Sequence, residues 1–142
     1  MTFYSKLIAT LLLLSVASVI GCRQRSPDEV EAIIAKSETL RHIDTICKEF
    51  PHPDQFELER KVLGGNSEIS SIDYQYIAHM PFQEVKPFYQ NPLLRANYNF
   101  RDEDYAEPLI NKIWFRLDDV SIYIENRPPS WIVNIGCNKR SL

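Results

Sequence analysis

The chain has 142 residues, of which 44% are hydrophobic and 25% are charged, and its formal net charge is −3. With nine prolines and only four glycines, this composition excludes collagen-like and low-complexity chains and is typical of one small globular unit. The sequence contains no strongly basic segment, so we expect no nucleic-acid partner.

The N-terminal segment is the most distinctive part of the sequence. Lys6 is followed by an uncharged, largely apolar run over residues 7–20 and then by Gly21 and Cys22. The run is shorter than the roughly 20 apolar residues that a membrane-spanning helix needs, and its length is typical of a secretory signal peptide. We therefore expect residues 1–21 to be a signal peptide that is removed. A buried N-terminal helix is the alternative, but such a helix usually shows a polar face.

Residues 19–22, Val-Ile-Gly-Cys, resemble the lipobox of bacterial lipoproteins. The resemblance implies that Cys22 receives a diacylglyceryl group, that lipoprotein signal peptidase removes the preceding peptide, and that the new amino terminus is acylated. Because two or more acyl chains give stable anchoring, we expect membrane lipid as a partner and a lipidated tether over residues 22–26. Arg23 rather than aspartate follows the cysteine, which by the family's sorting rule implies the periplasmic face of the outer membrane rather than the inner membrane.

Two further cysteines, Cys47 and Cys137, remain after the lipidated one. An exported protein meets an oxidising environment, so an even pair favours one disulfide bond. The bond would join the end of the first predicted helix to the last predicted strand. Two separate buried thiols are the alternative, whereas a redox-active pair would require a Cys-x-x-Cys spacing that the sequence lacks.

The predicted domain, residues 27–142, begins with an amphipathic helix. Ser26 can cap this helix, Pro27 suits its first position, and Glu29 completes a capping box. Apolar residues then recur at spacings of three and four, until the prolines at positions 51 and 53 end the pattern. We therefore expect one helix over about residues 27–48, with a weak point near residues 37–39.

Alternating patterns after the first helix predict an antiparallel sheet. Helical spacing returns once, over residues 82–94, where Pro87 predicts either a kink or a helix that begins at the proline. The order of elements predicts an α+β domain, in which helices cover one face of a sheet of about five strands and the second helix follows strand two. The predicted strands lie around residues 56–62, 71–76, 113–117, 120–124 and 131–137, with turns at residues 64–66 and at Asp118-Asp119.

The sequence contains no pattern that indicates a catalytic or metal site, and we expect no cofactor. Four potential ligands lie close together in sequence, but their spacing matches no established zinc pattern: His42, Asp44, Cys47 and His52. Residues 101–104 and the pair Asp118-Asp119 offer neighbouring carboxylates. Since neither group has the spacing of a calcium loop, we interpret them as a solvated loop and a hairpin turn.

Trp114 and Tyr123 fall on the polar side of their predicted strands and form a candidate binding surface. Exposed aromatic pairs bind glycans or partner proteins, although such a pair also occurs packed under a helix or completing the second face of a sheet. Because the sequence combines a lipobox-like motif with no catalytic constellation, we expect a non-enzymatic envelope lipoprotein that binds an envelope protein or a cell-wall glycan. The alternative is an envelope hydrolase that uses Asp102 or Glu103 together with His79.

Overall fold

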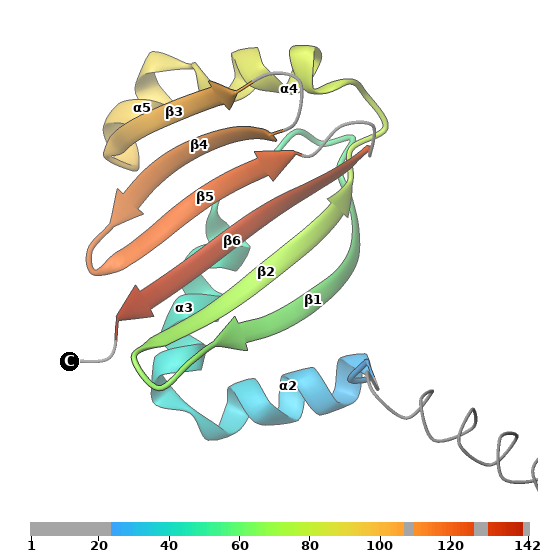
Figure 1. Cartoon of the computed structure of the whole chain (residues 1–142), viewed down its shortest axis with the longest axis vertical. Helices are drawn as coiled ribbons and strands as arrows, with labels where there is room; N and C mark the ends of the chain where they lie inside the picture. Colours follow the sequence, from blue (N-terminus) through green and yellow to red (C-terminus); the bar gives the residue numbers. More distant parts are fainter. Residues whose placement is uncertain (1–23, 107–109, 127–130, 141–142) are drawn as a thin grey trace, which may run out of the picture.

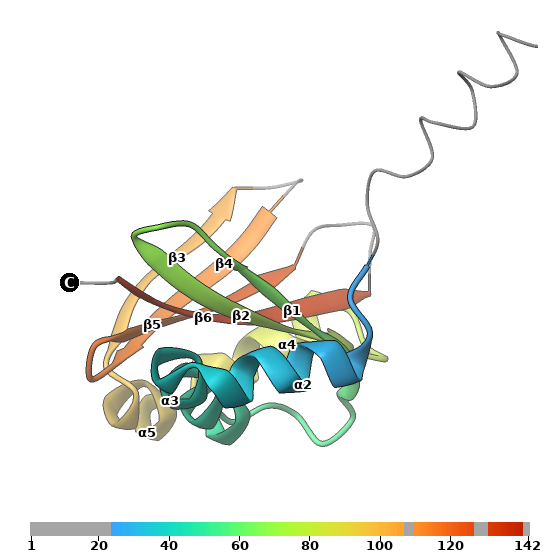
Figure 2. The ribbon, with the colours of Figure 1, turned by 90° about the horizontal axis from the view of Figure 1, so that it is seen from below.

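The computed structural model describes residues 24–106, 110–126 and 131–140. In this part of the chain, four helices lie on one face of a six-stranded antiparallel sheet (Figure 1; Figure 2), which confirms the predicted α+β class. The sheet has six strands rather than about five. In chain order the elements are α2 (Pro27–Lys36), α3 (Glu38–Glu49), β1 (Glu57–Gly65), β2 (Ile69–Ile77), α4 (Phe82–Tyr89), α5 (Pro92–Asn97), β3 (Phe100–Ala106), β4 (Ile110–Leu117), β5 (Val120–Asn126) and β6 (Ile132–Arg140).

The predicted first helix is divided into two at Ser37. The capping box at the start of α2 is present, because the Ser26 hydroxyl accepts a hydrogen bond from the Glu29 amide and the Glu29 carboxylate accepts one from the Ser26 amide. At Ser37 the backbone is extended, and the serine hydroxyl accepts a hydrogen bond from the Leu40 amide at the start of α3. The predicted single helix is therefore two helices, and the break lies at the weak point predicted near residues 37–39, because the serine caps the start of a new helix.

The order of strands in the sheet is β1-β2-β6-β5-β4-β3. The last strand, β6, lies between β2 and β5 and joins the β1-β2 hairpin to the β3-β4-β5 meander. Along the central strands, β-branched and aromatic residues that face the helices alternate with mostly polar residues on the opposite face. Asp118 has a φ of 53° in the turn between β4 and β5, at the place where the sequence predicted a turn.

Two short helices replace the single helix that was predicted over residues 82–94. Pro87 lies inside α4, so α4 does not begin at this proline. The Asn91 side chain accepts hydrogen bonds from the amides of Leu93 and Leu94 at 2.9 and 3.2 Å, and Pro92 takes the first position of α5. An asparagine cap followed by proline favours a new helix start, which explains why the chain begins α5 here.

Residues 101–104, interpreted from the sequence as a solvated loop, belong to edge strand β3. This strand pairs with β4, with a shift of register between Phe100 and Asp102. Aspartate and glutamate are depleted in strands, so the sequence pattern gave no indication of this element. Charged residues at a sheet edge also discourage pairing with another chain.

The core lies between the sheet and the helices and contains the predicted disulfide. Cys47 on α3 is bonded to Cys137 on β6, with a Cα–Cα distance of 5.9 Å, and both cysteines are buried. Nearby, the rings of Phe50 and Tyr89 are stacked with centroids 6.0 Å apart. The Tyr89 hydroxyl is buried and has no hydrogen-bond partner among the described residues.

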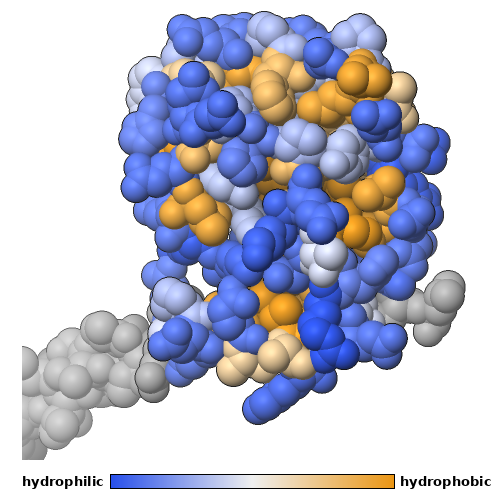
Figure 3. All heavy atoms as spheres, turned by 180° about the vertical axis from the view of Figure 1, so that it is seen from behind, coloured by the Kyte–Doolittle hydropathy of each residue, from blue (hydrophilic) through white to orange (hydrophobic). Residues whose placement is uncertain are grey.

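The outer surface of the helical layer is largely hydrophilic. Figure 3 shows this side, where hydrophobic residues form separate patches among hydrophilic ones. Within the described ranges, the helices are too short or too polar to cross a membrane. The opposite side of the sheet, which faces the viewer in Figure 1, is covered by none of the four helices. We call this side the open face.

Candidate functional site

The predicted aromatic pair lies near the centre of the open face. Trp114 on β4 is the cross-strand neighbour of Tyr123 on β5. Tyr123 in turn pairs with Gly136 on β6, and Gly136 pairs with Asp73 on β2. The ring centroids of Trp114 and Tyr123 are 5.3 Å apart, and the ring planes are inclined by 50°. Both side chains are half-buried. Strand pairing therefore brings residues from four strands into one row across the sheet.

Tyr123 extends across Gly136 and reaches the carboxyl group of Asp73. Its hydroxyl donates a hydrogen bond to Asp73 Oδ1 at 2.6 Å. A Cβ atom on Gly136 would collide with the Tyr123 ring and hydroxyl and with the same Asp73 oxygen. Burial raises the pKa of the Asp73 carboxyl, and the negative charge of Glu125 adds to this effect. The glycine and the hydrogen bond together hold the tyrosine ring in one orientation.

Lys112 places its ammonium group beside both aromatic rings. The Nζ atom lies 4.8 Å from the Trp114 ring centroid and 4.7 Å from that of Tyr123, which is within the range of cation–π attraction. The same atom is 2.9 Å from Glu125 Oε2. The Lys112 side chain is 27% exposed and the Glu125 side chain 8% exposed. We call Lys112, Trp114, Tyr123 and Glu125 the aromatic cluster. In it, two rings and a carboxylate contact the ammonium group of the lysine.

A shallow hollow of about 480 Å³ adjoins Trp114 on the open face. Its lining includes Asp102 on β3, Arg116 on β4 and Ser121 on β5. The hollow therefore has an indole wall next to a carboxylate, a guanidinium and a hydroxyl group. These groups together supply both hydrogen-bond donors and acceptors. Because Trp114 belongs to the hollow and to the aromatic cluster, one ligand could contact both.

The proposed lipid-attachment residue, Cys22, lies outside the described residues, as do the signal peptide and the first residue of the tether after it. The described chain begins at Gln24. The anchor, the cleavage site and the membrane location therefore stay predictions.

The four residues considered for zinc binding are not brought together. His42 Nε2 lies 3.2 Å from Asp119 Oδ1, and Cys47 is part of the disulfide. Asp44 accepts hydrogen bonds from a lysine and a tyrosine, and His52 packs against aromatic rings. Within the ranges that the structure describes, no group of three or more His, Cys, Asp or Glu side chains is placed to hold a metal ion.

The acidic residues considered for hydrolysis also lie apart from the histidine. His79 follows β2, and its Nε2 lies 3.0 Å from a glutamate carboxylate on β1. Glu103 lies on β3, at the opposite edge of the sheet, and accepts a hydrogen bond from the Tyr105 hydroxyl at 2.6 Å. This bond, together with an arginine partner, lowers the pKa of the Glu103 carboxyl. Asp102 lines the hollow beside Trp114, and neither His79 nor Glu103 lines that hollow.

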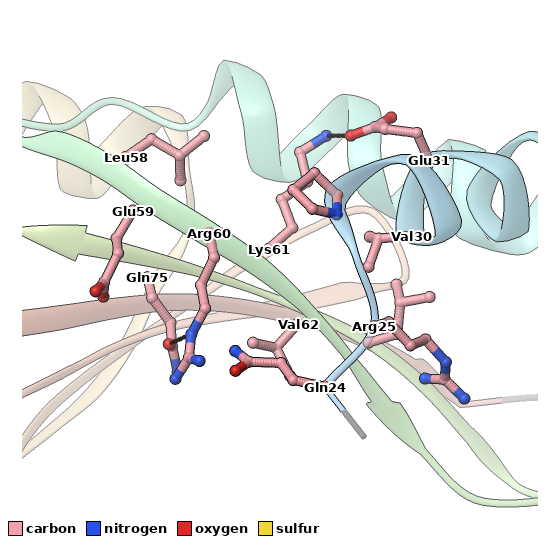
Figure 4. A pocket seen from close by; sticks show the side chains of 12 residues that line it. Gln24, Arg25, Val30, Glu31, Leu58, Glu59, Arg60, Lys61, Val62 and Gln75 are labelled. Atoms are coloured by element: carbon pink, nitrogen blue, oxygen red, sulfur yellow. Dashed lines mark hydrogen bonds and ion pairs between the residues drawn. The ribbon is translucent and has the colours of Figure 1, made fainter. Parts of the chain in front are cut away.

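A second concave region, a cleft of about 780 Å³, separates the start of α2 from edge strand β1 (Figure 4). Two cationic side chains of β1 line it and are already engaged. Lys61 Nζ donates a hydrogen bond to Glu31 at 2.7 Å, and Arg60 donates one to the Gln75 side chain. Strands β2, β6 and β5 separate this cleft from Trp114. The predicted aromatic pair, Trp114 and Tyr123, lies on the open face, so we take the open face as the candidate site.

Several residues of the site were not identified from the sequence, among them Asp73, Lys112, Glu125 and Gly136. Lys112 and Glu125 alternate with buried residues in the same phase as Trp114 and Tyr123, so the alternation pattern could have found them. Asp73 and Gly136 also alternate with buried residues of β2 and β6, but nothing in the sequence indicates that they lie beside Tyr123. Their position beside Tyr123 depends on the insertion of β6 between β2 and β5, which joins residues that are distant in sequence.

Comparisons with protein-family models, curated proteins and solved structures find no match to this chain. The interpretation of the open face therefore depends on its geometry and chemistry.

Proposed function

We propose that this chain is a lipid-anchored binding module of the bacterial envelope, and that its open face binds a cell-wall or glycan component. The observation that carries the proposal is the hollow beside Trp114, in which an aromatic wall adjoins Asp102, Arg116 and Ser121. A sugar ring has apolar C–H faces that pack on aromatic rings, and its hydroxyl groups need hydrogen-bond donors and acceptors. A small number of precisely placed polar groups beside an apolar wall is typical of small-ligand sites.

The rigidity of the neighbouring Tyr123 ring supports the same proposal. Its hydroxyl is bound to Asp73, and its ring occupies the space above Gly136. A side chain that is already fixed loses little conformational entropy when a ligand binds, so more of the contact energy remains as affinity. The aromatic pair is therefore suited to present a preformed surface to a ligand.

The binding test compares two tryptophan variants in a pull-down with cell-wall glycan fragments. Trp114→Ala should lower the amount of bound glycan at least tenfold, because it removes the wall of the hollow. Trp131→Ala is the matched control, since Trp131 is 55% exposed and does not line the hollow. Full retention of glycan by Trp114→Ala would contradict the proposal. Capture of an envelope protein that depends on Trp114 would instead favour the protein-binding alternative.

The proposed anchor is acylated Cys22 at the periplasmic face of the outer membrane. It is supported by the lipobox-like residues 19–22 and by the position of Pro27, which begins α2 a few residues later and keeps the domain close to its tether. Metabolic labelling with a fatty-acid analogue should label the wild type and not Cys22→Ala. Because Cys47 and Cys137 are bonded to each other, they offer no thiol for acylation. Unlabelled wild-type protein would refute the anchor.

A further inference from the structure

We propose that the aromatic cluster is a binding site for the ammonium group of a ligand, and that the ammonium group of Lys112 occupies this site when no ligand is bound. The inference rests on the proposed binding function and deepens it, because it names the chemistry that the ligand must carry. The required group is a primary amine, on a sugar or on a peptide of the envelope.

The contacts of Lys112 show that the cluster accommodates an ammonium group. Nζ lies at nearly equal distances from the two ring centroids, 4.8 and 4.7 Å, and 2.9 Å from a Glu125 oxygen. Aromatic rings attract a cation most strongly where water is excluded. The Glu125 carboxylate is only 8% exposed, and a carboxylate so deeply buried strongly favours contact with a cation. The cluster is therefore selective for positive charge.

The cluster keeps its shape when the lysine side chain moves away. The Tyr123 ring is fixed by Asp73 and by the space above Gly136, and neither contact involves Lys112. Glu125 lies on the same strand as Tyr123 and is buried. Lys112, in contrast, has a long flexible stem that gains rotamer freedom when it is released. A ligand amine would therefore find a preformed site after displacing it.

The open face also provides a position for the displaced lysine. Asp104 on edge strand β3 is the cross-strand neighbour of Lys112, on the side away from Glu125. Side chains that face each other across paired strands lie within contact distance. The Lys112 ammonium can thus move from Glu125 toward Asp104 without losing a carboxylate partner. This arrangement lowers the cost of opening the site.

The remainder of the ligand would lie in the hollow on the other side of Trp114. A molecule whose amine contacts the cluster can place hydroxyl or amide groups near Asp102, Arg116 and Ser121. An amino sugar has this combination of one cation with several hydroxyl groups. A neutral sugar would use the hollow alone and would gain nothing from displacing Lys112.

The test is a fluorescence titration of the full chain in detergent micelles at constant ionic strength. Trp131→Phe leaves Trp114 as the only tryptophan of the chain. In this background, Lys112→Gln removes the internal ammonium group and should tighten glucosamine binding at least tenfold. N-acetylglucosamine, which has the same ring without the positive charge, should bind at least tenfold more weakly than glucosamine to the Lys112→Gln variant. Its affinity should not respond to Lys112→Gln.

The matched control is Lys86→Gln in the same background. Lys86 Nζ lies 3.7 Å from the ring centroid of Tyr105, which is another cation–π pair but lies outside the aromatic cluster. This substitution should leave the affinity for glucosamine unchanged. Adding Tyr123→Leu to Lys112→Gln should abolish saturable binding, because one of the two rings is lost.

Three further outcomes separate this inference from the proposed function. Equal binding of both sugars, unaffected by Lys112→Gln, would overturn the ammonium site and leave the glycan function standing. Binding of lysine amide but not of glucosamine, tightened by Lys112→Gln, would support the ammonium site and count against a glycan ligand. If neither amine produces a saturable change in the Lys112→Gln variant, the ammonium site is refuted.

Discussion

Replacing both Cys47 and Cys137 by alanine should lower the free energy of unfolding by at least about 4–5 kcal/mol. The bond closes a loop with a sequence separation of 90 residues. For a loop of this length, the entropy that the crosslink removes from the unfolded chain corresponds to about 4–5 kcal/mol at 25 °C. Both cysteines are almost fully buried, so the lost packing of two sulfur atoms adds to the cost. The expected loss is a large part of the stability of a typical small domain.

The assay is urea unfolding followed by circular dichroism, with the oxidised wild type and the double variant measured side by side. Reductant is the matched control, because it should lower the unfolding midpoint of the wild type and leave that of the double variant unchanged. A double variant within about 1 kcal/mol of the oxidised wild type would show that the crosslink does not constrain the unfolded chain as the loop-entropy argument requires.

Three further substitutions test the packing of the site and of the core, each by urea unfolding. Gly136→Ala should destabilise the fold by about 1–3 kcal/mol, because the added Cβ displaces Tyr123 from its hydrogen bond; unchanged stability would contradict this contact. Tyr89→Phe should leave stability unchanged or raise it by about 1 kcal/mol, since it removes a buried hydroxyl without a partner in the described structure; a loss above about 1 kcal/mol would argue for a hidden partner. The pKa of Asp73 is raised by burial, so the folded state binds its proton more tightly than the unfolded state. The stability of the wild type relative to Asp73→Asn should therefore fall as pH rises from about 4 through the raised pKa, and a difference that is flat between pH 4 and 7 would contradict the shift.

The alternation of buried and exposed residues along the strands was sufficient to predict the aromatic pair of the site from the sequence. Trp114 and Tyr123 were placed on the same face because each alternates with residues that are buried in the core. The same alternation placed Cys137 toward the helices, and the position of Cys47 near the end of a helix completed the predicted bond. These conclusions need only the local period of the chain and the oxidising environment that the predicted signal peptide implies.

Some features were not predicted because a segment can form either of two local structures. Others depend on pairing between strands that are distant in sequence. Ser37 can either continue a helix or cap a new one, and periodicity does not distinguish the two. Residues 101–104 form a strand because β4 offers a free edge, although their own side chains disfavour a strand. Asp73 becomes a partner of Tyr123 only through β6, which separates β2 from β5 and is the last strand of the chain. Such contacts follow from topology and not from the pattern of any one segment.

The register of β6 is specified from both faces of the sheet. Gly136 and Cys137 are consecutive, so their side-chain positions point to opposite faces. Cys137 enters the core and is bonded to Cys47, and Gly136 lies beneath the ring of Tyr123 on the open face. A slip of one residue would place the cysteine on the open face and the glycine in the core, and would break both arrangements at once. The disulfide therefore does more than stabilise the fold, because it holds in place the strand position on which the orientation of the Tyr123 ring depends.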